Sequence, residues 1–113
     1  MSVLRRIDPE RRDELLRELR QFLEELRTEL PVEAVYLFGS FARGRVHEGS
    51  DIDLLIIGHF HERFPERTLR VLRLNRRNLP ISPFCYTPQE IERGKAEGNP
   101  FILAALAEGR RLV

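Results

Sequence analysis

The sequence is short of cysteine and of long apolar runs, and each shortage narrows what the protein can be. Cys85 is the only cysteine among the 113 residues, so the chain forms no internal disulfide and holds no zinc through several cysteines. No apolar run approaches the roughly 20 residues that a membrane helix needs, and residues 1–6 carry no apolar signal region. We therefore expect a protein of the reducing cytoplasm, neither secreted nor membrane-spanning.

A large excess of charge of one sign is also missing. The formal net charge is +1, and Lys95 is the only lysine, because arginine supplies nearly all the positive charge. A near-neutral chain has no general electrostatic attraction to the phosphates of DNA or RNA, so nucleic acid is not the expected partner. Charged residues make up 33% and hydrophobic residues 42%, as in folded soluble proteins. At this length we expect one domain, residues 1–113.

The first predicted element is a long amphipathic helix. It begins at Asp8-Pro9, with proline at the first helical position, and ends before Pro31. Its apolar stripe repeats at helical spacing and consists of Leu15, Leu16, Leu19, Phe22, Leu23, Leu26 and Leu30. We expect this stripe to pack on the domain's own sheet; a second copy of the chain, in a homo-oligomer, is the alternative partner.

Apolar stretches predict three strands, at residues 33–38, 51–57 and 79–86. The first two are consecutive and are expected to be antiparallel neighbours. The third is reached through a helix that begins at Pro65, so it is expected to run parallel to its partner. Pro83 lacks an N–H group and fits an edge strand.

Two shorter helices are predicted after the third strand. Thr87-Pro88-Gln89-Glu90 is a capping box that starts a helix at residue 88, and Gly94 and Gly98 are expected to end it. A last helix starts after Asn99-Pro100 and ends at Gly109. The whole order predicts an α+β fold with a small mixed sheet of about three strands, flanked by helices.

Residues 35–57 carry most of the functional information. One apolar run stops at Gly39-Ser40, and Ser50-Asp51-Ile52-Asp53 opens the next. Two acids at positions i and i+2 of a strand point to the same face, with Cα atoms roughly 6.5 Å apart, so both can reach one hard cation. The backbone at Gly39-Ser40 can approach a phosphate because glycine has no Cβ. These features predict phosphoryl chemistry on a metal-bound nucleotide.

Simpler interpretations of the same residues are weaker. Asp51 alone fits a turn-forming acid at a strand entry, but Asp53 interrupts an apolar run, where a carboxylate is costly unless it is paired or binds a metal. Gly39 and Gly44 have P-loop spacing, yet a P-loop continues with lysine and serine or threonine, and this chain has Arg45-Val46. A glycosidase pair is disfavoured because its carboxylates flank a sugar from separated positions.

Three other groups are expected to be structural. His59-Phe60-His61 has no third metal ligand at a recognisable spacing, so exposed loop histidines are expected. The arginines at 70, 73, 76 and 77 favour a solvated helix face. Cys85 has no histidine near it in the sequence and is expected to be a small core residue.

Phe38-Gly39-Ser40, ten further residues and Asp51-Ile52-Asp53-Leu54 resemble the G-S-x10-D-x-D signature of the minimal nucleotidyltransferases, a branch of the DNA polymerase β nucleotidyltransferase superfamily. The resemblance implies transfer of a nucleoside monophosphate, AMP from ATP, to an acceptor hydroxyl. It implies that Asp51 and Asp53 are catalytic and ligate Mg²⁺ or Mn²⁺. It also implies that the nucleotide is held by Gly39, Ser40, Arg43 and Ser50.

One residue departs from that family pattern. The family has a third carboxylate on the next strand, whereas residues 79–86 contain no acid and Ser82 stands at the expected place. Serine is a poor metal ligand and a poor base at neutral pH. Three explanations are open: Glu90 reaches the site, although its capping role explains it better; a partner supplies the group; or the activity is weak.

The length of the chain bears on its partner. With the core fold built, 113 residues leave no second domain for an acceptor, so the acceptor site is expected on another chain. Chains of this size resemble the smaller member of two-gene modules, paired with a helical HEPN-type protein, in some of which the small subunit is an antitoxin that nucleotidylates its partner. The alternative is a catalytically weak or inactive binding module that neutralises a helical partner.

Overall fold

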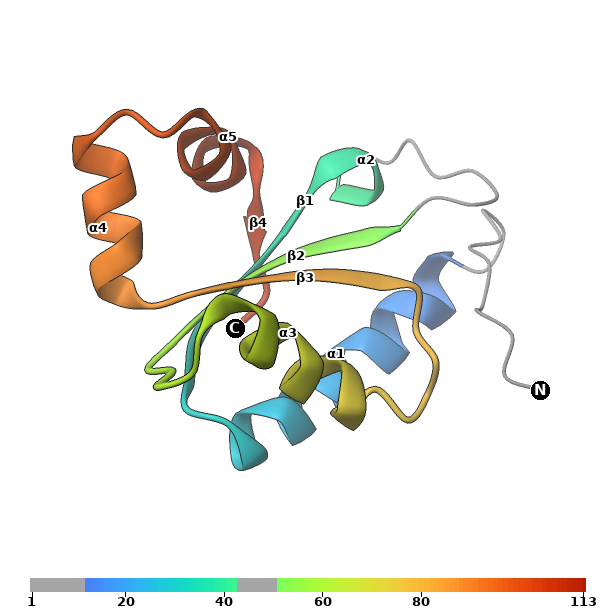
Figure 1. Cartoon of the computed structure of the whole chain (residues 1–113). Helices are drawn as coiled ribbons and strands as arrows, with labels where there is room; N and C mark the ends of the chain where they lie inside the picture. Colours follow the sequence, from blue (N-terminus) through green and yellow to red (C-terminus); the bar gives the residue numbers. More distant parts are fainter. Residues whose placement is uncertain (1–11, 43–50) are drawn as a thin grey trace.

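The computed structural model describes residues 12–42 and 51–113, which form a four-stranded mixed sheet between two layers of helices (Figure 1). The elements are α1 (Arg12–Glu29), β1 (Val32–Phe38), α2 (Gly39–Ala42), β2 (Ile52–Gly58), α3 (Phe64–Leu74), β3 (Ile81–Tyr86), α4 (Pro88–Ala96), α5 (Pro100–Glu108) and β4 (Arg110–Arg111). The strand order is β3-β2-β1-β4. The predicted Asp8-Pro9 helix start lies outside the described residues.

The pairing of the strands confirms the predicted topology. β1 is antiparallel to β2, and β2 is parallel to β3. β3 lies at the edge of the sheet, where the missing N–H of Pro83 breaks no ladder on its open side. The prediction of about three strands falls short by one: β4 pairs with β1 through Tyr36 and Leu37. A two-residue strand is too short to produce an apolar alternation in the sequence.

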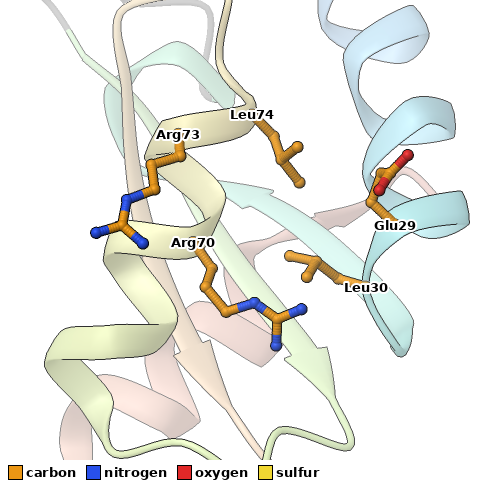
Figure 2. Close-up of a pocket in the computed structure, with 5 residues that line it drawn as sticks. All are labelled: Glu29, Leu30, Arg70, Arg73 and Leu74. Atoms are coloured by element: carbon orange, nitrogen blue, oxygen red, sulfur yellow. The ribbon is translucent and has the colours of Figure 1, made fainter.

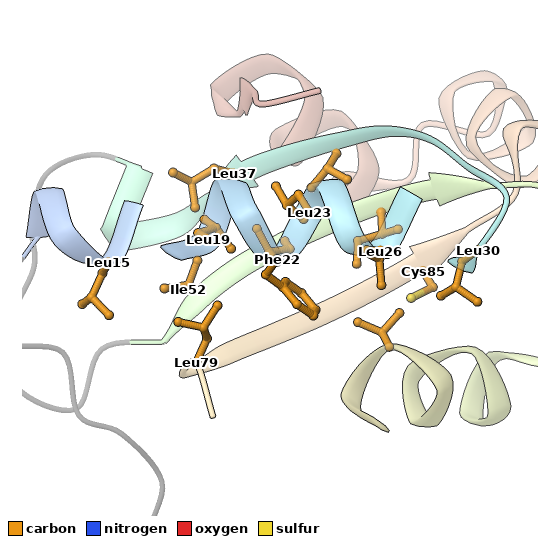
Figure 3. Packing of buried hydrophobic residues seen from close by; sticks show 14 of the residues in the cluster. Leu15, Leu19, Phe22, Leu23, Leu26, Leu30, Leu37, Ile52, Leu79 and Cys85 are labelled. Atoms are coloured by element: carbon orange, nitrogen blue, oxygen red, sulfur yellow. The ribbon is translucent and has the colours of Figure 1, made fainter. Parts of the chain in front are cut away.

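The larger core lies between α1 and one face of the sheet. The leucine stripe of α1 faces the strands, and its central residues Leu19, Phe22, Leu23 and Leu26 are fully buried (Figure 3). They pack with Val35 and Leu37 of β1, Ile52, Leu54 and Ile56 of β2, and Cys85 of β3. The stripe therefore packs on the chain's own sheet, as predicted. No helix in the described segments is long and apolar enough to cross a membrane.

The opposite face of the sheet packs against α4 and α5. Alternation along β2 turns Leu55 and Ile57 to this side, where they meet Ile91 and Ile102. The capping box of α4 is confirmed: the Thr87 hydroxyl accepts from the Glu90 N–H at 3.1 Å, and the Glu90 carboxylate accepts from the Thr87 N–H at 2.7 Å.

Gly94 does not end α4, contrary to the sequence-based prediction. The helix continues through it to Ala96, because Gly94 is buried where α4 meets α5. A Cβ at Gly94 would overlap the Cδ1 of Ile102. This glycine serves the close approach of two helices, while Gly98, with a φ of +72°, provides the left-handed residue after the helix.

Candidate active site

The two aspartates lie where β2 begins. Asp51 directly precedes the strand and is exposed; Asp53 is the second residue of the strand and is half-buried. Because Ile52 and Leu54 belong to the α1 core, alternation places Asp53 on the face that carries α4 and α5. Asp51 has the same parity, so both predicted metal ligands share one face at one end of the sheet.

Gly39 brings the end of β1 against this pair. Phe38 is in register with Asp53 across the antiparallel ladder, and the chain then turns at Gly39 with a φ of +77°. A Cβ at Gly39 would overlap the Oδ2 of Asp53 and lie 3.2 Å from its Cγ. The Gly39-Ser40 turn and the Asp53 carboxylate are therefore immediate neighbours, as a site for a metal-bound phosphate requires.

The remaining predicted nucleotide-binding residues are only partly placed. Ser40 belongs to the one-turn helix α2, which continues directly from Gly39. Arg43 and Ser50 lie outside the described residues. Their roles therefore stay predictions from the signature.

Ser82 completes a row of residues across the sheet. It is in parallel register with Asp53, and its Oγ donates a long hydrogen bond of 3.3 Å to the Oδ2 of Asp51. A hydroxyl thus contacts Asp51 from the residue opposite Asp53, at the place expected for a third acid. Among residues 12–42 and 51–113, no three side chains of histidine, cysteine, aspartate or glutamate gather into a metal-binding group.

Glu90 is not that third acid, because other groups hold it. Its Oε1 accepts from the Arg67 Nη1 at 2.7 Å and from the Thr87 N–H at 2.7 Å. Burial raises the pKa of Glu90, but the hydrogen bonds from Arg67 and Thr87 outweigh this and leave the pKa below its ordinary value. Glu90 follows the far end of β3, and the four residue-to-residue steps from Ser82 to Tyr86 alone span about 13 Å. Capping and ion pairing explain Glu90 fully.

A pocket of about 300 Å³ opens beside Asp51. Asp51 and Ser82 form its polar wall, and the residues from α3 and the segment before β3 that line it are Leu72, Asn75, Leu79, Pro80 and Ile81. The Asn75 amide donates to the Leu79 carbonyl at 2.9 Å and accepts from the Leu79 N–H at 3.0 Å, which ties down the segment leading into β3. Sequence reasoning missed Leu72 and Asn75, because only the fold brings α3 to Asp51.

A second pocket, of about 220 Å³, lies between the end of α1 and α3 (Figure 2). Its lining is Glu29, Leu30, Arg70, Arg73 and Leu74. Both helices pack on the face of the sheet opposite to Asp53, and neither aspartate is among the residues that line this pocket. Arg70 is also engaged there by an ion pair with Glu62.

Several arginines and one histidine outside the site have structural partners. Arg67 pairs with Glu90, and Arg77 pairs with Glu25 at 2.7 Å, so much of the positive charge on and after α3 is neutralised. His59 is exposed and contacts Glu33 at 2.9 Å. These contacts favour the predicted solvated helix face and loop histidines.

Comparisons with known proteins agree with this geometry. The profile of the nucleotidyltransferase domain family matches residues 19–105, which include the Gly39 turn, both aspartates and β3. The crystal structure of a candidate nucleotidyltransferase from Sulfolobus solfataricus is similar in fold, with a TM-score of 0.61, 29% identity, and 74% of this chain and 77% of that chain covered. No curated protein matches the chain significantly. With most of its length matched and the signature residues brought together by β1 and β2, the chain belongs to the nucleotidyltransferase family, in its minimal form.

Proposed function

We propose that this chain transfers AMP from ATP to an acceptor hydroxyl on a partner protein, with Asp51 and Asp53 as the catalytic carboxylates. The contact between the Gly39 turn and the Asp53 carboxylate carries this proposal. This contact places the Gly39 backbone, which a phosphate can approach, beside the Asp53 carboxylate, which can bind the cation that accompanies the phosphate.

The donor set fits Mg²⁺, or Mn²⁺ in its place. Mg²⁺ is usually held by one or two carboxylates together with substrate phosphates, and Asp51 and Asp53 offer two carboxylates on one face, one of them exposed. When bound, the ion would neutralise charge on the triphosphate and on the leaving pyrophosphate. The chain itself fixes Asp53 between β1 and β3, and Ser82 orients Asp51 through its hydroxyl.

The reaction requires a base that this chain does not provide in its described residues. The acceptor oxygen forms a bond to the α-phosphorus, the bond from that phosphorus to the oxygen bridging toward the β-phosphate breaks, and pyrophosphate leaves. The proton of the hydroxyl must go to a base. Ser82 is a poor one, and Glu90 is held by Arg67. We therefore place the base on the acceptor protein.

The surface near Asp51 suits a protein acceptor. α3 exposes Leu69 and Leu72, with exposed fractions of 49% and 41%. Leu72 also lines the pocket that Asp51 and Ser82 border. A helical partner of HEPN type that packs on these leucines would present a hydroxyl next to Asp51, and its modification would give the chain an antitoxin-like role in the cytoplasm.

Calorimetry with ATP tests the nucleotide site. We expect the wild-type chain to bind ATP only with Mg²⁺ present, Asp53→Asn to lose that binding, and Asp13→Asn to keep it. Asp13 is a matched control because it is an exposed aspartate on α1, on the other side of the sheet. Absence of Mg²⁺-dependent ATP binding in the wild type would overturn the proposal.

A transfer assay separates this function from a second candidate, a binding module that neutralises its partner without catalysis. Ser82 at the third acid position is the observation that favours the second candidate. The chain would be incubated with ATP labelled at the α-phosphate and with a purified helical protein of HEPN type as the candidate acceptor. Label transfer that is lost in Asp51→Asn supports catalysis, whereas a stable complex without label supports the binding module.

A further inference from the structure

Three phenylalanines gather beside the row of Asp53 and Ser82. They are Phe38, Phe84 and Phe101. The ring centroids are 5.8 Å apart for Phe38 and Phe84, 5.5 Å for Phe38 and Phe101, and 5.0 Å for Phe84 and Phe101. The three rings come from β1, β3 and the first turn of α5. We call them the aromatic triad. Each ring contacts the other two, so packing within the triad holds the three side chains in place.

The sheet register relates this triad to the carboxylates. Asp53 is opposite Ser82, and two residues further along the same parallel ladder Leu55 is opposite Phe84. Residues two apart on a strand share a face, so Phe84 projects on the side of Ser82 and Asp53. Strand rise and strand spacing put the Cα atoms of Phe84 and Asp53 about 8 Å apart. Phe38 is the direct cross-strand neighbour of Asp53.

Phe84 is also exposed, unlike most large apolar residues of this sheet. Its exposed fraction is 38%, whereas Leu55 beside it is fully buried. Two other rings hold the exposed ring of Phe84, and it lies two residues along the strand direction from the proposed metal ligands. It is an exposed apolar surface at the place where a nucleotide would extend from its phosphates.

We propose that Phe84 is the stacking surface for the nucleobase of the bound nucleoside triphosphate, with Phe38 and Phe101 holding its ring in place. The inference rests on the proposed function and deepens it. With the α-phosphate at Asp51 and Asp53, only the sugar separates the nucleobase from the phosphate, so the nucleobase can reach the triad. Aromatic rings stack on the π-face that every base has, and the neighbouring rings restrict the motion of Phe84 before the ligand arrives.

The assignment is tested by comparing the binding of two ligands, one with a nucleobase and one without. Calorimetry would compare Mg²⁺–ATP with Mg²⁺–tripolyphosphate for the wild type, Phe84→Ala and Phe84→Leu. Stacking of one base is worth about 5- to 150-fold in affinity, so we expect both variants to lose ATP affinity within that range and to keep tripolyphosphate binding. Phe84→Leu keeps apolar volume and removes the π-face, so it reports on stacking even where Phe84→Ala fails to fold.

Phe64→Ala is the matched control. Phe64 has an exposed fraction of 43% and contacts a ring of its own, Tyr86 at 4.9 Å, but it starts α3 and lies outside the triad. We expect this variant to bind both ligands like the wild type. An equal loss of ATP and tripolyphosphate in the Phe84 variants, or no loss of either, would overturn the assignment. So would intact ATP binding together with lost partner binding, because Phe84 would then belong to a protein interface.

A fluorescent variant gives a second readout. The sequence contains no tryptophan, so Phe84→Trp places a single indole in the triad. We expect its emission to change on addition of Mg²⁺–ATP and to stay constant with Mg²⁺–tripolyphosphate. Failure of this inference and failure of the proposed function give different results. A wild type that binds neither ligand would contradict the nucleotide site itself. A wild type that binds both ligands with equal affinity would contradict only the base-stacking role.

Discussion

Gly39 lies so close to the carboxylate of Asp53 that no side chain fits between them. The Cβ of any other residue would overlap Oδ2 of Asp53, and the backbone φ of +77° is itself one that other residues adopt only with strain. The signature glycine therefore has a steric reason beyond access for a phosphate: the acid on β2 occupies the space that its side chain would need.

Replacing Gly39 by alanine should damage both stability and ligand binding. The left-handed backbone alone costs an alanine about 1–2 kcal/mol, and the added methyl group must also displace the Asp53 carboxylate. We expect urea unfolding to show a loss larger than the backbone cost, and calorimetry to show that Mg²⁺-dependent ATP binding is lost.

Gly98→Ala is the control for Gly39→Ala. Gly98 has nearly the same φ, +72°, and a Cβ there would meet nothing within 4 Å. Its alanine variant should lose only the backbone contribution and should bind ATP like the wild type. Equal losses of stability in the two variants, with ATP binding intact in both, would contradict the steric role of Asp53.

Ser82→Asp should complete the group of carboxylates. Ser82 is in register with Asp53 and within hydrogen-bond distance of Asp51, so an aspartate there adds a third negative charge to the pair. Without a cation, like charges at this spacing destabilise the fold. We expect a lower thermal midpoint without Mg²⁺ and a larger rise of that midpoint on adding Mg²⁺ than in the wild type.

Ser82→Asn separates charge from size in that experiment. Asparagine has nearly the shape of aspartate and no charge. Its thermal midpoint should respond to Mg²⁺ no more than that of the wild type. A Mg²⁺ response of Ser82→Asp that matches Ser82→Asn would show that position 82 does not face the proposed metal ligands.

Local patterns in the sequence were enough to predict much of this site. The period of two along β2 put Asp51 and Asp53 on one face, and the glycine turn before them marked the neighbouring strand end; both follow from a few consecutive residues. The capping box at Thr87 is equally local, and the topology of the three longer strands followed from the order of strands and helices along the chain. The bounds of these strands differ from the predicted ones by at most two residues.

Features that depend on register or on helix packing were not predictable. The aromatic triad needs residues from β1, β3 and α5 to meet, and no local pattern contains that information. Gly94 looked like a helix end because its sequence neighbours do not show that Ile102 packs against it. Glu90 forms an ion pair with Arg67, a buried residue 23 positions earlier, and no local pattern in the sequence predicts this pair.

Arg67→Leu should be strongly destabilising. The Arg67 side chain is 8% exposed; it bonds to the Glu62 carbonyl at 2.7 Å and to Glu90, and it lies 4.7 Å from the centroid of Phe64. Its removal leaves the carbonyls of Glu62 and Cys85 without this donor and leaves Glu90 with only the Thr87 N–H, and unsatisfied buried polar groups of this kind cost about 1–3 kcal/mol. Urea unfolding measures this loss. Arg77→Leu is the control, because the exposed Arg77–Glu25 pair should change stability little.

The same pair predicts a dependence of stability on acid pH. Burial opposes ionisation of Glu90, but the hydrogen bond from Arg67 prevails, so the pKa of Glu90 in the folded chain lies below the value of about 4.3 for an unperturbed glutamate. The contribution of its charge is therefore present above that value and is lost as the pH falls through the folded-state pKa. Glu90→Gln should be less stable than the wild type at pH 7, and the difference should shrink below pH 4. A difference that is constant with pH would contradict this linkage.

Cys85 should be unreactive in the folded chain and should make stability fall at alkaline pH. Burial raises the pKa of its thiol to about 12, so almost no thiolate exists at pH 8. We expect Ellman's reagent to label the native protein very slowly and to label one thiol per chain after unfolding. Because an unfolded thiol ionises at about pH 8.5, the unfolded state releases its proton first as the pH rises, and the free energy of unfolding decreases above that pH. Cys85→Ala lacks this decrease, so the wild type should lose more stability than the variant between pH 8 and pH 10; fast labelling of the native chain would contradict the burial of the thiol.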